Sequence, residues 1–192
     1  MITGIFMASG SGSRMGQNKL LLPFRDAALF RHGLEAACRS SIDRLTVVSG
    51  HEEILSFCAE NGICHIFNSN ASEGQSASIR LGVSFAEADS SYIFIPADQP
   101  FLTAEFIDSL ISAGKEYPES IIIPKYRNSP GSPTVFPSHL REELLALTGD
   151  VGGKAIIRTH PELVRYREIP DCLLLTDIDT PEDYSAHNKH LR

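Results

Sequence analysis

The sequence predicts an α/β fold of three layers, in which a mostly parallel sheet is covered by helices on both faces. Short apolar segments rich in β-branched and aromatic residues recur along the 192 residues, and segments of helical periodicity lie between them. Strand, helix and strand follow one another four times, and right-handed crossovers of this length place helices on both faces of a parallel sheet. No linker or composition break divides the chain. We therefore expect a single domain over residues 1–192.

Each expected element follows from its local pattern. The expected strands are short apolar runs at residues 3–8, 45–50, 64–68, 92–97, 120–126 and 133–137, with two later ones near VRYREI (164–169) and LLLTDI (173–178). The expected helices have the 3.6-residue period and cover residues 28–40, 52–62, 76–88, 104–117 and 139–149. Ligands in such sheets bind beyond the carboxyl ends of the strands. Three polar loops fall there: SGSGSRMG, NSNASEGQSAS and ADQP.

The composition excludes two classes of function. A formal net charge of -7 argues against a general nucleic-acid or membrane-surface binder, because both need excess Lys and Arg over a face. No apolar run approaches the roughly 20 residues of a membrane span, and the N-terminus lacks the features of a secretory signal. We therefore expect a cytoplasmic protein whose anionic ligands meet a local cationic site.

The cysteines are expected to be reduced core residues. There are four of them, and no two form a C-x-x-C pair. Their neighbours are typical of buried helix or strand positions, which favours packing over a disulfide or zinc role at Cys38, Cys58, Cys64 and Cys172.

The first polar loop predicts a phosphate-binding site. MASGSGSRMGQNK follows the first strand, and its glycines and serines leave backbone N–H groups accessible to an anion. The spacing fits neither a Walker A loop nor a dinucleotide fingerprint. Arg14 can bridge two phosphate oxygens and Lys19 supplies a mobile point charge, a pairing that suits a triphosphate. A flexible turn with two surface cations is the alternative.

Six segments in order resemble the MobA-like nucleotidyltransferases. FMASGSGSRMGQNKLLLPF is similar to the family's signature loop, and its K-L-L-L-P ending is most similar to the molybdenum cofactor cytidylyltransferases. The other similar segments are EGQSASIRLGV (73–83), PADQP (96–100), PGSPTVF (130–136), LTGDVGGK (147–154) and DIDTPEDY (177–184). They span almost the whole chain, so the resemblance implies a Rossmann-like nucleotidyltransferase fold.

The resemblance implies transfer of a nucleotidyl group, CMP from CTP, to molybdopterin with release of pyrophosphate. Such a reaction requires two anions to be positioned and their charge neutralised, in part by Mg²⁺. Arg14, Lys19 and Asp98 are then the catalytic residues. The nucleotide-binding residues that it implies are Ala8, Ser9, Gly10, Gly12, Ser13, Arg14, Gly16, Lys19, Gly74, Ser76 and Ser78. A molybdenum hydroxylase or its maturation factor is the expected protein partner.

Three aspartates are candidate metal ligands. Asp98 follows a strand and supplies the oxygen that Mg²⁺ prefers, although it could instead stabilise its own turn. Asp150 could hold metal or the pterin, or cap a short helix. Asp179 could complete the metal site, but Thr180, Pro181 and Asp183 also spell a helix start with a cap, a proline at the first position and an acid at the third.

The helix after Gly74 has its own alternatives. Its start could offer the hydroxyls of Ser76 and Ser78 to a base or ribose, whereas Ser76 could simply cap the helix and Ser78 could face water.

The sequence also departs from the family pattern at Ser9, Ser132 and the run Gly152–Gly153–Lys154. These departures leave the base and the acceptor open. A GTP-dependent molybdopterin guanylyltransferase, another NTP transferase acting on a sugar phosphate, and a non-catalytic carrier of the cofactor are the alternatives. A carrier has no need to neutralise a triphosphate, so Arg14, Lys19 and Asp98 disfavour it.

Overall fold

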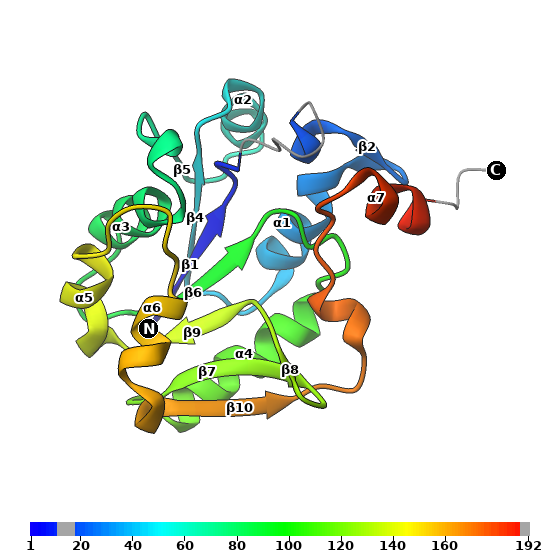
Figure 1. Ribbon diagram of the computed structural model, residues 1–192. Coiled ribbons are helices and arrows are strands. Elements are labelled where there is room, and N and C mark those ends of the chain that lie inside the picture. Colours follow the sequence, from blue (N-terminus) through cyan, green and yellow to red (C-terminus); the bar gives the residue numbers. More distant parts are fainter. Residues whose placement is uncertain (11–17, 189–192) are drawn as a thin grey trace.

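The computed structural model describes residues 1–10 and 18–188 and confirms the predicted α/β fold (Figure 1). Its main sheet has the strand order β10–β7–β9–β6–β1–β4–β5, with β8 paired to β7. The strands are β1 (Ile2–Met7), β4 (Arg44–Ser49), β5 (His65–Phe67), β6 (Ser91–Pro96), β7 (Ile121–Tyr126), β8 (Ser129–Pro130), β9 (Thr134–Phe136) and β10 (Val164–Glu168). Most neighbours pair in parallel. β9 is antiparallel to both β6 and β7, and β8 is antiparallel to β7.

Helices cover both faces of this sheet. They are α1 (Leu29–Arg39), α2 (Glu52–Glu60), α3 (Gln75–Phe85), α4 (Ala104–Glu116), α5 (Arg141–Leu145), α6 (Lys154–Thr159) and α7 (Pro181–His187). Successive strand residues point to opposite faces of the sheet, so each strand contributes side chains to the hydrophobic core on each face. Phe6 and Val47 pack with the helices α1, α2 and α4, whereas Ile5 and Val48 pack with α3, α5 and α6. This continuous burial on both faces explains the unbroken apolar runs that predicted the strands.

Short elements surround the first loop. The 3-10 helix η2 (Lys19–Leu21) follows it, and the hairpin of β2 (Pro23–Phe24) and β3 (Ala27–Ala28) comes next. The Asn18 side chain caps η2 by accepting a hydrogen bond from the Leu20 N–H. The other 3-10 helices are η3 (Ala71–Glu73), η4 (Ser138–Leu140), η5 (Pro161–Leu163) and η6 (Cys172–Leu175). Within the described part of the chain, no helix has the length and apolar content needed to cross a membrane.

Some local predictions were wrong. The expected last strand at LLLTDI is the 3-10 helix η6 followed by extended chain, because the Asp171 carboxylate caps η6 by accepting from the Leu173 N–H. The expected helix 139–149 ends early and is divided between η4 and α5. All four cysteines are free, as expected, but only Cys58 is buried; the exposed ones are Cys38, Cys64 and Cys172.

Candidate active site

An open cavity of about 950 Å³ lies where the carboxyl ends of β1 and β6 meet the loops that follow them. This is the edge of the sheet at which the sequence places its polar loops. Its walls also include β7, β9, α6 and the segment before α7. The volume is at the upper end of the roughly 300–1,000 Å³ typical of small-molecule sites. The cavity can therefore hold a large ligand or two smaller ones.

One end of the cavity is built around Lys19. Its ammonium lies 2.7 Å from Oδ2 of Asp98 and 2.5 Å from Oδ1 of Asp179, so it bridges two carboxylates from distant parts of the chain. The residue is only 8% exposed. Burial by itself would lower the pKa of the Lys19 ammonium, but the charges and hydrogen bonds of Asp98 and Asp179 outweigh it and raise the pKa above the ordinary value. The lysine is therefore charged in the folded protein.

The position of Asp179 is set by the start of α7. The predicted capping box is present: the Thr180 side chain accepts from the Asp183 N–H, and the Asp183 carboxylate accepts from the Thr180 N–H. The same carboxylate also accepts a hydrogen bond from the Asp179 N–H at 3.2 Å. The Ile178 N–H donates to the Asp98 carbonyl at 2.9 Å, which ties the two acidic segments together. The helix start and the contact of Asp179 with Lys19 therefore coexist.

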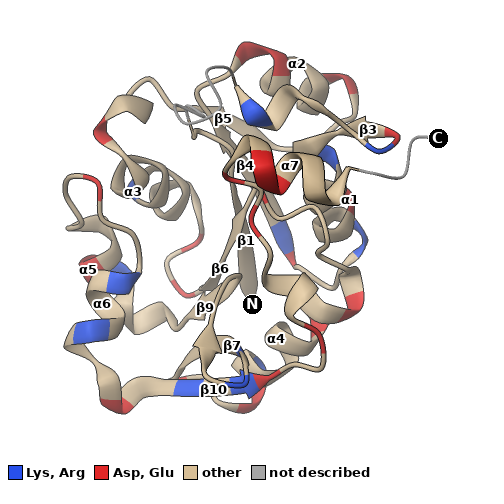
Figure 2. Ribbon diagram, turned by 45° about the vertical axis from the view of Figure 1, so that its right-hand side comes forward, with Lys and Arg blue, Asp and Glu red and all other residues tan. Residues whose placement is uncertain are grey.

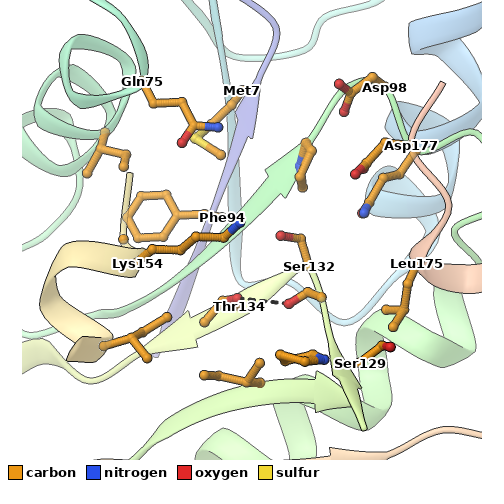
Figure 3. Close-up of a pocket in the computed structure, with 18 of the residues that line it drawn as sticks. Met7, Gln75, Phe94, Asp98, Ser129, Ser132, Thr134, Lys154, Leu175 and Asp177 are labelled. Carbon is orange, nitrogen blue, oxygen red and sulfur yellow. Dashed lines mark hydrogen bonds between the residues drawn. The ribbon is translucent and has the colours of Figure 1, made fainter. Parts of the chain in front are cut away.

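Sequence reasoning missed Asp177. It lines the cavity beside Asp98 in Figure 3, on the segment that leads to Asp179. Partial burial raises the pKa of the Asp177 carboxyl to about 6, and the charges of Asp98 and Asp179 add to the rise, while a hydrogen bond from the Gln99 side chain opposes it. The alternation T-D-I-D was the available signal, because residues two apart on extended chain point to one side.

The first loop enters the cavity at Gly10. The Ala8 N–H donates to the Val48 carbonyl, and the Ser9 hydroxyl donates to the same carbonyl at 3.3 Å. The Ser9 hydroxyl also accepts from Nδ2 of Asn68 at 3.2 Å. Four further predicted residues of this loop lie outside the described part of the chain: Gly12, Ser13, Arg14 and Gly16.

Hydrogen bonds join the predicted segment at Gly74 to the loop before α6. Gly74 has a φ of +92°, a conformation that favours glycine. The Ser76 hydroxyl donates to the Gly149 carbonyl at 2.5 Å, and the Asp150 carboxylate accepts from the Gln75 N–H at 3.2 Å. Ser78 is buried and accepts a hydrogen bond from Asn68. These serine hydroxyls and the Asp150 carboxylate thus connect loops around the cavity, and Asp150 caps α3 instead of the segment that follows it.

Two further cations line the opposite wall. Figure 3 shows Lys154 extending from α6 into the cavity beside Phe94, across from Asp98 and Asp177. Arg158 lines the same wall one helical turn later. Within residues 1–10 and 18–188, neither side chain has an ion-pair partner. Figure 2 shows basic positions on α6 and β10 along this side of the molecule. The wall is therefore suited to an anionic group.

A comparison with known families decides the class. The model of the MobA-like NTP transferase domain matches residues 4–164, which is most of the chain. The chain belongs to this family. It is a MobA-like nucleotidyltransferase, as the six ordered segments predicted.

Curated relatives of this MobA-like nucleotidyltransferase carry several names. Purine catabolism protein PucB of Bacillus subtilis (strain 168) is 30% identical over 95% of this chain and 94% of its own length. Nicotine blue oxidoreductase of Paenarthrobacter nicotinovorans is 26% identical over 94% and 93%. Molybdenum cofactor cytidylyltransferase of Escherichia coli (strain K12) is 23% identical over 94% and 92%.

Solved structures share the fold. The crystal structure of Rv0371c from Mycobacterium tuberculosis H37Rv superposes with a TM-score of 0.87 and is 25% identical, over 98% of this chain and 97% of that one. A crystal structure of the same protein in complex with manganese has a TM-score of 0.83 at 23% identity, over 99% of both chains. This MobA-like nucleotidyltransferase therefore shares its fold with these solved structures over nearly all of the 192 residues.

Proposed function

We propose that the protein transfers CMP from CTP to a terminal phosphate of molybdopterin and releases pyrophosphate. An oxygen of the acceptor phosphate attacks the α-phosphorus, and the bond from that phosphorus to the β-phosphate oxygen breaks. The observation that carries the proposal is the convergence of Lys19, Asp98 and Asp179 at one end of the cavity, next to the first loop. The family is shown; CTP and molybdopterin are the proposed substrates.

On the nucleotide side, we assign the triphosphate to Arg14, Lys19 and the backbone of the first loop. Ala8, Ser9 and Gly10 begin this loop directly after β1, and Gly10 faces the cavity. The hydrogen bonds that Ser9 makes with Val48 and Asn68 fix the shape of the wall at this point. Gly74, Ser76 and Ser78 then support the nucleotide through the loops that they hold together.

The proposed metal is Mg²⁺, held by Asp98 and Asp179. Both carboxylates already contact one cation, the Lys19 ammonium, so their oxygens can converge on a single positive centre. No group of three or more His, Cys, Asp or Glu side chains among the described residues could hold a metal ion. Mg²⁺ commonly binds one or two carboxylates together with substrate phosphates, which fits this donor set. The relative in complex with manganese supports a divalent ion. When bound, the ion would neutralise charge on the phosphates.

On the acceptor side, we assign the molybdopterin phosphate to Lys154 and Arg158. They line the wall opposite the acidic end, and the cavity between is large enough for two ligands. We leave Asp150 out of the proposed metal site, because its carboxylate contacts the Gln75 N–H and not the Lys19 ammonium at which Asp98 and Asp179 meet.

Three of the relatives are named for the molybdenum cofactor, which supports this acceptor. The Escherichia coli relative is named for the cytidylyl reaction and matches 94% of this chain, whereas the two relatives named for the guanylyl reaction, one of them as probable, match 64% and 57%. A molybdenum hydroxylase or its maturation factor is the protein partner that we propose.

One assay tests the proposal. The full chain is incubated with Mg²⁺, molybdopterin and each of the four nucleoside triphosphates in turn, and pyrophosphate release is followed. We expect release with CTP. Release with another triphosphate alone would show that CTP is the wrong nucleotide, and no release with any of the four would overturn the proposed transfer.

A further inference from the structure

The Lys19 ammonium occupies the place that a metal ion would need. It lies within 2.7 Å of an oxygen of Asp98 and 2.5 Å of an oxygen of Asp179, and the residue is 8% exposed. Mg²⁺ binds carboxylate oxygens at roughly 2.0–2.1 Å. A metal ion bound by both of these oxygens would need the space between them, so the ion and the Lys19 ammonium cannot occupy the site at the same time.

We propose that Lys19 is the resident counter-ion of this metal site and keeps free divalent ions out until a nucleotide arrives. The inference deepens the proposed function and rests on it. The triphosphate gives the Lys19 ammonium a new anionic partner, and only then does the ammonium leave the space between the Asp98 and Asp179 oxygens that the metal would take. Lysine suits this exchange because its charge lies at the end of a flexible four-carbon stem.

The energetic argument is one of competition. A metal that binds alone must displace a buried ammonium from two carboxylates, and the separated ammonium then has no partner. The apparent affinity for metal alone is thus reduced by the small fraction of molecules in which Lys19 has moved away. Because nucleotide binding increases that fraction, metal and nucleotide strengthen each other's binding, and this coupling is reciprocal.

The competition predicts effects of opposite sign for one substitution. In Lys19→Met no ammonium competes with the metal for the Asp98 and Asp179 oxygens, so we expect Mn²⁺ alone to bind about tenfold tighter or more than to the wild type. The same variant lacks a contact to the triphosphate, so Mn²⁺ with a non-hydrolysable CTP analogue should bind more weakly than to the wild type. A lysine that only held the triphosphate would produce the second effect without the first.

The experiment is a titration of the metal-free full chain with Mn²⁺, followed by electron paramagnetic resonance of the free ion. Lys115→Met is the matched control, because Lys115 is an exposed lysine of α4 outside the cavity, and it should leave Mn²⁺ binding unchanged. The double variant Lys19→Met/Asp98→Asn should lose the gain. Unchanged or weaker Mn²⁺ binding to Lys19→Met would overturn the inference.

A measurement on the wild type keeps the inference testable if Lys19→Met does not fold. Mn²⁺ alone should leave the melting temperature almost unchanged, whereas Mn²⁺ together with the CTP analogue should raise it, since a ligand that binds only the native state stabilises it. A full rise with Mn²⁺ alone would contradict the competition. Failure of every nucleotide to bind would count against the proposed function, while the metal-only titration would still decide the role of Lys19.

Discussion

Replacing Lys154 with methionine should weaken the binding of molybdopterin, the proposed acceptor, and leave the binding of CTP unchanged. The side chain enters the cavity from α6, opposite the acidic end, and has no ion-pair partner among the described residues. A hydrogen bond to a charged group contributes roughly 1.5–3 kcal/mol. Because Lys154 is exposed and solvent screens its charge, we use the lower end of that range. About 1.5 kcal/mol corresponds to about a tenfold higher KM for molybdopterin.

The assay is pyrophosphate release at saturating CTP with molybdopterin varied, and then the reverse. Lys115→Met makes the same change of charge and length on an exposed helix outside the cavity, so both KM values should stay at the wild-type level. An unchanged KM for molybdopterin in Lys154→Met would refute the assignment of this wall to the acceptor. A tenfold rise in the KM for CTP instead would place Lys154 on the triphosphate side.

Three further predictions concern single groups. Asp98→Asn removes one charge from the acidic end and should lower kcat by about 10²- to 10³-fold, the usual cost of losing one preorganised charge partner; wild-type turnover would move the metal elsewhere. The raised pKa of Asp177 means that the folded protein holds this proton from about pH 4 to about pH 6, so its contribution to stability falls as the pH rises through that window. In chelator, Asp177→Asn should therefore melt about 2–4 °C higher at pH 7.5, taking about 1 kcal/mol after solvent screening, and show no gain near pH 4; equal differences at both pH values would contradict this. A thiol reagent should modify Cys58 only on unfolding, because burial raises its pKa to about 11, whereas it should reach three exposed thiols in the native protein: Cys38, Cys64 and Cys172.

Local pattern was enough to predict most of the fold. The strands β1 and β6 are buried over most of their length, and so are the apolar parts of β4 and β7, so their apolar runs stand out from the helices between them. The segment LLLTDI was misassigned because a run of three leucines is equally compatible with a strand and with a 3-10 helix. The 3-10 helix forms because the Asp171 side chain caps it by accepting a hydrogen bond, and the hydrophobic period of a sequence carries no information about such a bond.

The acidic end of the site was only partly predictable. Asp98 was found because it follows a strand, and the helix start at Thr180 was read correctly from its capping residues. Their meeting at Lys19 depends on residues 79 and 160 positions away along the chain, and no local pattern carries such a contact. The cation that binds both carboxylates was therefore assigned to the triphosphate alone from the sequence.

The two ends of the cavity hold their cations in different states, and this difference sets an order of binding. Lys19 is buried and bridges Asp98 and Asp179, so ligands at that end must first rearrange an ion pair. Lys154 is exposed and has no such partner among residues 1–10 and 18–188, so an anion can bind there without any rearrangement. The empty protein should therefore bind molybdopterin without metal, but it should bind metal only with nucleotide. Calorimetry on the metal-free chain distinguishes this order from its reverse, in which the acceptor would bind only after nucleotide and metal were present.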